Sequence, residues 1–172
     1  MVDFWDAVEG FTRGFLEAAG REAAISYGSG RDDNERGRIE RLCRQLGWSV
    51  DERLGNTILL HFNDPLGTIR KVYIDDGDEG LVSFTVYSFA IMPAQEVPEQ
   101  VIGYLLRQNS DVSIGAWQVR IDDEGDALCR VAYRALGAGL KADSFKFICE
   151  SMIGEAAAFD KRMHAAGLLR LG

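Results

Sequence analysis

The sequence predicts an α+β fold in which helices cover a mostly antiparallel sheet. Several short stretches alternate apolar with polar residues, which is the period of β-strands, and the connections between them are too short for parallel crossovers. A long stretch from Asp143 to about His164 instead places apolar residues every three or four positions, as an amphipathic helix does. The expected order of elements is α-ββββ-α-ββ-α, with an extra helix at the N-terminus.

Residues 1–34 are expected to form an N-terminal amphipathic helix and a flexible linker, and residues 35–172 the α+β domain. The helix would span residues 3–19. Its apolar stripe and flank, which form a candidate interaction surface, consist of Phe4, Trp5, Val8, Phe11 and Phe15. Such a stripe needs a burial site, which could lie on its own domain, on a second subunit or on a membrane surface. The acidic polar face of the helix opposes anionic lipid, so membrane binding is the weakest of the three.

The domain itself is expected to begin with a helix over residues 35–46, which Gly47 would end. Alternation then predicts a four-strand meander with strands at residues 48–54, 58–62, 68–74 and 81–91. The acidic segment 75–80 would form the last turn of this meander. A final hairpin would pair Trp117–Asp122 with Leu128–Arg134.

Two more helices are expected around that hairpin. The first would run from Pro98 to Asn109, with Asn109 as a left-handed stop and with Val101, Ile102, Leu105 and Leu106 facing inward. The second would begin at Asp143 as its N-cap and would cover the sheet. Its apolar stripe comprises Phe145, Ile148, Met152, Ala156, Phe159 and Met163.

Charge and hydropathy exclude several kinds of partner. The formal net charge is −8, and the arginines of residues 31–44 are interleaved with aspartates and glutamates, so we expect no nucleic-acid partner. No apolar run approaches the roughly 20 residues of a membrane span. Acidic residues stand where a signal peptide would be basic, and we expect a cytoplasmic protein without a membrane partner.

The residues with reactive side chains form no recognisable catalytic or metal motif. Cys43, Cys129 and Cys149 are widely spaced and each lies in an apolar pattern, which indicates buried free thiols in a reducing compartment. His61 lies in an alternating strand and His164 at the end of a helix, and both positions favour structural roles. Pairs of carboxylates that meet in space remain open as acid-base candidates.

Two further motifs are better explained by turns. Gly137–Ala142 matches a dinucleotide fingerprint, but no strand follows the next helix to complete a βαβ unit. The acidic turns 75–80 and 122–126 suggest calcium, but the twelfth position counted from Asp76 or from Asp122 is a tyrosine, where an EF-hand has glutamate. We therefore expect no catalytic residues, no cofactor and no metal site.

The arrangement resembles the YbjN-domain family, proposed regulators of bacterial sensory transduction, whose fold is similar to that of type III secretion chaperones. The likeness covers about residues 36–164 and rests on four stretches: Phe84–Ser88, Tyr104–Asn109, Trp117–Tyr133 and the helix from Asp143. These are apolar patterns and turns, so they speak for the fold far more than for an activity.

The resemblance implies a small non-catalytic protein-interaction domain, either a regulator or a chaperone-like binder of a protein client, and a homodimer. A sensor domain for a small molecule or metal is the alternative, with its site between sheet and helices or at the acidic turns. An enzyme of unrecognised type is a third possibility.

Overall fold

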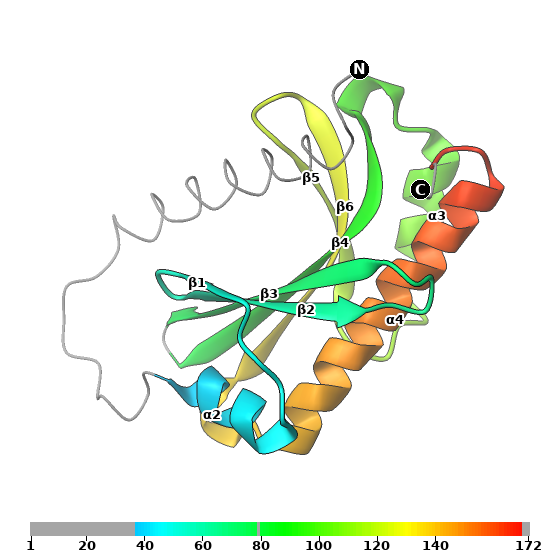
Figure 1. Cartoon of the computed structure of the whole chain (residues 1–172). Helices are drawn as coiled ribbons and strands as arrows, with labels where there is room; N and C mark the ends of the chain where they lie inside the picture. Colours follow the sequence, from blue (N-terminus) through cyan, green and yellow to red (C-terminus); the bar gives the residue numbers. More distant parts are fainter. Residues whose placement is uncertain (1–36, 79, 170–172) are drawn as a thin grey trace.

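The computed structural model describes residues 37–78 and 80–169 and confirms the α+β fold (Figure 1). Its antiparallel sheet has six strands in the order β1-β2-β3-β4-β6-β5. The described elements are α2 (Arg38–Leu46), β1 (Glu52–Leu54), β2 (Thr57–Asn63), β3 (Ile69–Asp78), β4 (Leu81–Pro93), η1 (Ala94–Glu96), α3 (Glu99–Gln108), β5 (Ala116–Ile121), β6 (Asp126–Leu136), η2 (Gly137–Gly139) and α4 (Ala142–Ala165). The expected N-terminal helix and linker, 1–34, lie outside the described residues.

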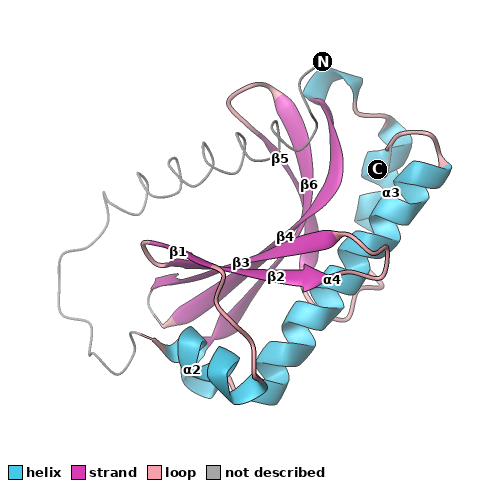
Figure 2. Ribbon diagram, viewed as in Figure 1, coloured by secondary structure: helices cyan, strands magenta, loops and turns pink. Residues whose placement is uncertain are grey.

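The three described α-helices lie on the same side of the sheet, which we call the first face (Figure 2). Alternate residues of β4 point to this face, and Val82, Phe84 and Val86 are each 0% exposed. Cross-strand partners share a face, so the buried residues of β2, β3 and β6 join them in one core. The opposite side is the second face of the sheet.

The long helix α4 covers the first face as its periodicity predicted. All six stripe residues are at most 6% exposed and belong to the core cluster. Phe145 packs against Phe84 of β4, with ring centroids 5.8 Å apart, and Phe159 packs against Trp117 of β5 at 4.7 Å. One helix therefore contacts both the centre and an edge of the sheet.

The strand boundaries differ from expectation at two places. β1 holds only Glu52–Leu54, because Trp48 leaves the sheet and packs its ring on Phe62 at 4.9 Å. Conversely, β3 and β4 extend through most of the segment expected to be an acidic turn, and only residues 79 and 80 separate them. The register shifts between Asp75 and Asp78, so an irregularity accommodates the extra length.

Two helix ends were also predicted wrongly. Asn109 has a right-handed φ of −60°, and its side chain acts instead as a clamp on the edge strand. Its Oδ1 accepts a hydrogen bond from the Trp117 backbone N at 2.6 Å, and its Nδ2 donates to the Trp117 carbonyl at 3.1 Å. The N-cap of α4 is Lys141, two residues before the expected Asp143, which lies in the first turn.

The inward face of α3 is narrower than expected. Val101 and Leu105 are buried, but Ile102 is 37% exposed and Leu106 is 66% exposed. Val101 and Leu105 are four positions apart and therefore lie on the same side of the helix. The residues that follow each of them, Ile102 and Leu106, are turned toward solvent. None of the helices in residues 37–78 and 80–169 combines the length and hydropathy that crossing a membrane requires.

Gly47 ends α2 with φ +70°, as expected, and donates its backbone N–H to the last turn. Gly47→Ala is expected to destabilise the protein by about 1 kcal/mol, because a Cβ disfavours this left-handed conformation. The control is Gly154→Ala inside α4, where a new Cβ would meet nothing within 4 Å. That change should stabilise by roughly 0.5–1 kcal/mol. Urea unfolding measures both, and equal effects of the two would contradict the assignment.

Candidate functional site

The two histidines take structural positions far apart in the chain. The His61 backbone N–H donates to Asp51 Oδ2 at 2.7 Å, and the ring Nδ1 lies 3.7 Å from Asp51 Oδ1. At the other end, His164 Nδ1 lies 2.9 Å from the carbonyl oxygen of Leu169 and ties down the segment after α4. Neither ring is next to a serine or cysteine in any described contact, so the geometry builds no nucleophile–base pair.

Two of the three motifs assigned to turns, 122–126 and Gly137–Ala142, form short connections, whereas 75–80 lies mostly in β3. Asp122 Oδ1 accepts the backbone N–H groups of Glu124 at 3.0 Å and Asp126 at 2.8 Å, which closes the β5–β6 turn from within. Residues 137–139 form the short 3-10 helix η2 that leads into α4. Within residues 37–78 and 80–169, no group of three or more metal-ligating side chains comes together.

The three cysteines are free and buried. Burial raises the pKa of Cys43 and of Cys129 to about 11, and it raises the pKa of Cys149 further. A thiol is nucleophilic only as the thiolate, so these side chains are inert at neutral pH.

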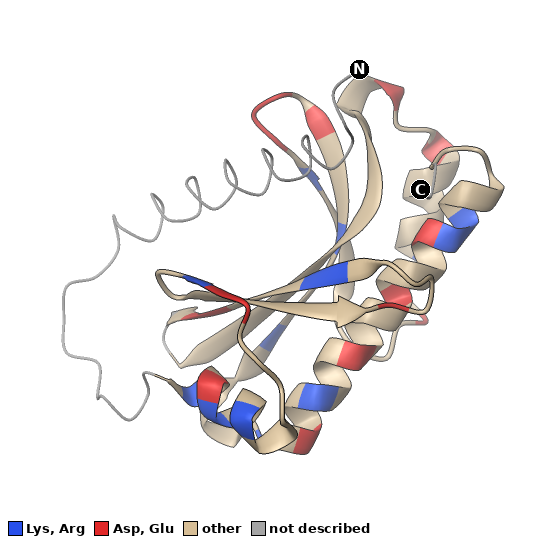
Figure 3. Cartoon of the chain, in the orientation of Figure 1, with Lys and Arg blue, Asp and Glu red and all other residues tan. Residues whose placement is uncertain are grey.

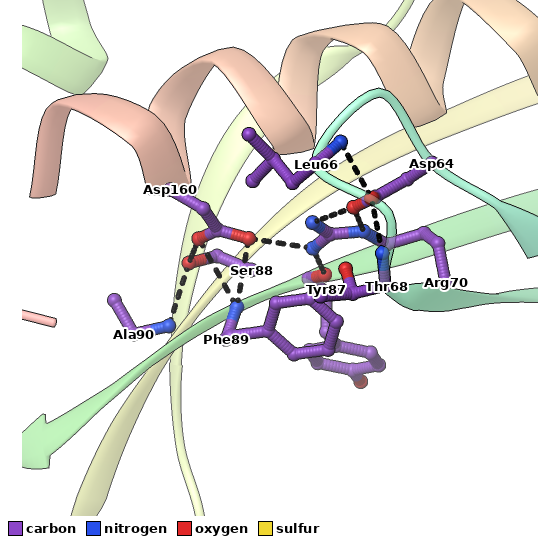
Figure 4. A network of polar contacts seen from close by, with 9 residues as sticks. All are labelled: Asp64, Leu66, Thr68, Arg70, Tyr87, Ser88, Phe89, Ala90 and Asp160. Atoms are coloured by element: carbon purple, nitrogen blue, oxygen red, sulfur yellow. Dashed lines mark hydrogen bonds and ion pairs between the residues drawn. The ribbon is translucent and has the colours of Figure 1, made fainter. Parts of the chain in front are cut away.

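A buried charged network is the densest polar cluster in the described chain (Figure 4). Arg70 of β3 is 1% exposed and donates to two carboxylates: Nη2 to Asp64 Oδ2 and Nη1 to Asp160 Oδ2, each at 2.7 Å. Asp160 belongs to α4, and its Oδ1 accepts the Ser88 hydroxyl at 2.5 Å and the Phe89 N–H at 3.1 Å. The network thus joins α4 to β3 and β4.

The electrostatics of this cluster favour a structural role. Burial would raise the pKa of Asp64, but hydrogen bonds from Arg70 and Thr68 outweigh it and hold that pKa below its usual value. At Asp160 burial dominates and raises the pKa, although Arg70 and Ser88 partly offset it. Every carboxylate oxygen that faces Arg70 is already hydrogen-bonded, and both side chains are 0% exposed. A substrate therefore has no access to these groups.

Sequence reasoning missed this cluster because its partners lie 6 to 90 positions apart. The only local signal was a charged residue, Asp160, directly after Phe159 in an apolar stripe. Acidic residues are almost never fully buried without a partner, so that position could have marked a buried pair.

The second face of the sheet is different in character. A row of cross-strand partners runs across it, comprising Leu59, Tyr73, Thr85, Ala132 and Ala116. The rings of Tyr73 and Tyr87 meet edge to face at 5.6 Å beside this row. None of the three described helices packs here, yet Leu59 is only 1% exposed and Leu128, on the same face, 3%. This face therefore has an apolar and aromatic centre.

Basic side chains surround that centre. By strand register, the second face carries Lys71, Arg120, Arg130 and Arg134. Figure 3 marks in blue where lysine and arginine occur along the ribbon. Arg130 is held in place by Gln118, whose Oε1 accepts from Nη2 at 2.8 Å and from Nε at 3.1 Å. The acidic residues of this face lie toward strand ends, at Glu52, Asp75 and Asp126. A chain of net charge −8 thus gathers cations on one surface.

A smaller apolar surface lies where α3 meets β5. Besides Ile102 and Leu106 on α3, two first-face residues of β5 are exposed: Val119 at 39% and Ile121 at 61%. β5 is also an edge strand, with backbone groups facing away from the sheet. The expected interaction stripe, Phe4 to Phe15, lies outside the described residues.

Comparison with known proteins supports the fold alone. No family model matches the sequence, and no curated protein matches it. The structure resembles YbjN from E. coli, a proposed transcription regulator, with a TM-score of 0.56 at 15% identity, covering 77% of this chain and 93% of that one. It also resembles a chain of the HopA1-SchA chaperone-effector complex, with a TM-score of 0.53 at 10% identity and coverages of 77% and 99%.

A third similar structure is an uncharacterised protein from Methanothermobacter thermautotrophicus, with a TM-score of 0.52 at 10% identity and coverages of 78% and 99%. The likeness to YbjN and to a type III secretion chaperone is thus confirmed for the fold. The named neighbours are a regulator and a chaperone complex, which are not enzyme classes.

Arg70→Met tests the buried network. The change should destabilise the protein by about 3–5 kcal/mol, because two buried carboxylates lose their counter-charge. Adding Asp160→Asn should recover part of this loss by removing one of the unpaired charges. Chemical denaturation measures both.

The matched control for this series is Lys146→Met on α4, which breaks an exposed pair with Glu150. It should change stability by less than about 0.5 kcal/mol. If Arg70→Met cost no more than Lys146→Met, the network would not hold α4 on the sheet.

Proposed function

We propose that this chain is a non-catalytic, chaperone-like domain that binds a protein client on the second face of its sheet. The observation that carries the proposal is the combination on that face of an aromatic centre with a basic surround. Aromatic residues and arginine are the side chains that most often dominate protein interfaces. The fold supports the same proposal, since one structure of this fold belongs to a chaperone-effector complex.

The chemistry of the face indicates what kind of client fits. The apolar row would take the apolar stripe of an amphipathic segment, and the surrounding Lys71, Arg130 and Arg134 would attract its acidic residues. Opposite charge at the rim raises the association rate and disfavours basic partners. The proposed client segment is therefore amphipathic and acidic.

A matched pair of charge reversals tests this proposal. Arg130→Glu should lower client recovery at least several-fold, because it places a like charge beside the acidic segment. Lys146→Glu changes the net charge by the same amount, but the Lys146 side chain is exposed on α4 and not on the second face. Quantitative mass spectrometry of proteins captured from lysate by the wild type and each variant gives the comparison.

A client set lost with Arg130→Glu and kept with Lys146→Glu supports the second face. Equal recovery by both variants would contradict it, and loss with Lys146→Glu alone would move the interface to the helices. Circular dichroism and unfolding curves of both variants show whether the fold is intact.

We also propose that the protein acts in the cytoplasm as a homodimer. Three buried free cysteines suit a reducing compartment. For the dimer, the exposed apolar residues of α3 and β5 supply a surface that a second copy would cover. This surface is separate from the client face, so both could be occupied together.

Leu106→Lys and Ile121→Lys test the dimer. Each places a charge on an apolar residue that is already more than 60% exposed, so the monomer fold should tolerate it. Light scattering at high micromolar concentration should show a dimer for the wild type and a shift toward monomer for the double variant. A monomeric wild type would contradict the proposal.

A further inference from the structure

The second face contains two leucines that are shielded from water without a described helix to shield them. Leu59 is 1% exposed and Leu128 is 3% exposed, and neither belongs to the core under α2, α3 and α4. The neighbouring Tyr73 and Tyr87 are partly buried as well. Together these side chains form an apolar surface in the middle of a sheet face, on which a further layer can pack.

We propose that residues 3–19 of the same chain form that layer, and that this segment occupies the face proposed above for the client. The claim that this segment competes with a client rests on the proposed function. The claim that it docks on the second face does not. The sequence of the segment matches the face on two counts, its apolar stripe and its charge.

The apolar match comes from helical spacing. Phe4, Val8, Phe11 and Phe15 recur at intervals of three and four, so a helix would present them on one side. A row of Leu59, Tyr73, Thr85 and Ala132 crosses the second face, and the ring of Tyr87 packs on Tyr73. Aromatic side chains bury 150–250 Å² each, which makes such a stripe a strong docking element.

The charge match is equally specific. Residues 3–19 contain four acidic residues and one arginine, so the segment is acidic. The face carries Lys71, Arg130 and Arg134 around its apolar row. An acidic amphipathic segment is the kind of partner that this basic surface favours, and the chain supplies one of its own.

The connection is long enough for docking within one chain. Residues 20–36 lie between the segment and Gly37, where the described domain begins. Seventeen residues reach roughly 55–60 Å when extended. Six strands about 4.8 Å apart make a sheet only about 24 Å across. A tethered segment also acts at a millimolar effective concentration, so docking in cis is favoured over docking on a second copy.

The consequence is a built-in competitor. A client must displace residues 3–19, so its apparent affinity equals its intrinsic affinity multiplied by the fraction of molecules in which the face is free. The N-terminal segment would thereby set the threshold at which a client binds.

Photo-crosslinking in the full chain tests the docking. Position 11 takes the photoreactive analogue p-benzoylphenylalanine, and labelled and unlabelled chains are mixed in equal amounts before irradiation. We expect crosslinks within one chain to β2, β3, β4 or β6 at second-face residues, located by mass spectrometry. Adding Arg130→Glu and Arg134→Glu should lower their yield several-fold.

Every other pattern overturns the inference. Crosslinks between labelled and unlabelled chains would mean docking on a second copy. Crosslinks to α3 or α4, or none at all, would mean that residues 3–19 do not cover the second face. If the charge reversals left the crosslinking yield unchanged, Arg130 and Arg134 would not contribute to the docking of residues 3–19.

Deletion of residues 1–36 separates this inference from the proposed function. If both hold, the shortened chain should recover more of the client set that depends on Arg130. Correct crosslinks with a client set indifferent to Arg130 would overturn only the proposed function. Failed crosslinks with a client set sensitive to Arg130 would overturn only the docking of the segment.

Discussion

A buried charged contact between Arg70 of β3 and Asp160 holds α4 on the first face of the sheet. A guanidinium that is only 1% exposed is stable only when its charge is paired. Asp64, in the loop after β2, and Asp160, on α4, supply the paired carboxylates. Asp160 also accepts hydrogen bonds from Ser88 and Phe89. These bonds fix where α4 lies along β4, as well as how closely it packs on the sheet. Apolar packing alone would hold α4 on the sheet without specifying its register so tightly.

With every described helix on the first face, the second face becomes the distinctive surface of the molecule. Its apolar centre would be a liability in water, and its arginines and lysine run against the acidity of the whole chain. The two features together favour an acidic amphipathic segment, whether from a client or from residues 3–19. The three thiols, by contrast, are buried and have raised pKa values.

Periodicity predicted the order of elements because local patterns determine it, and the α4 stripe is the clearest case. What it missed depends on contacts between distant residues. Trp48 leaves the sheet for the ring of Phe62, and Asn109 clamps the backbone of Trp117. Likewise, the cationic second face appears only when strand register places Lys71, Arg130 and Arg134 on one side. The expected stripe on residues 4–15 remains a prediction.

We expect the client to lie on the second face, and carbene footprinting of the chain alone and with a captured client distinguishes this from binding on the helices. A client bound there leaves Tyr73, Tyr87 and Arg130 labelled no more strongly than in the chain alone, while residues 3–19 become more strongly labelled as the client displaces them. Protection confined to the outer faces of α3 and α4, with no change at residues 3–19, would contradict it.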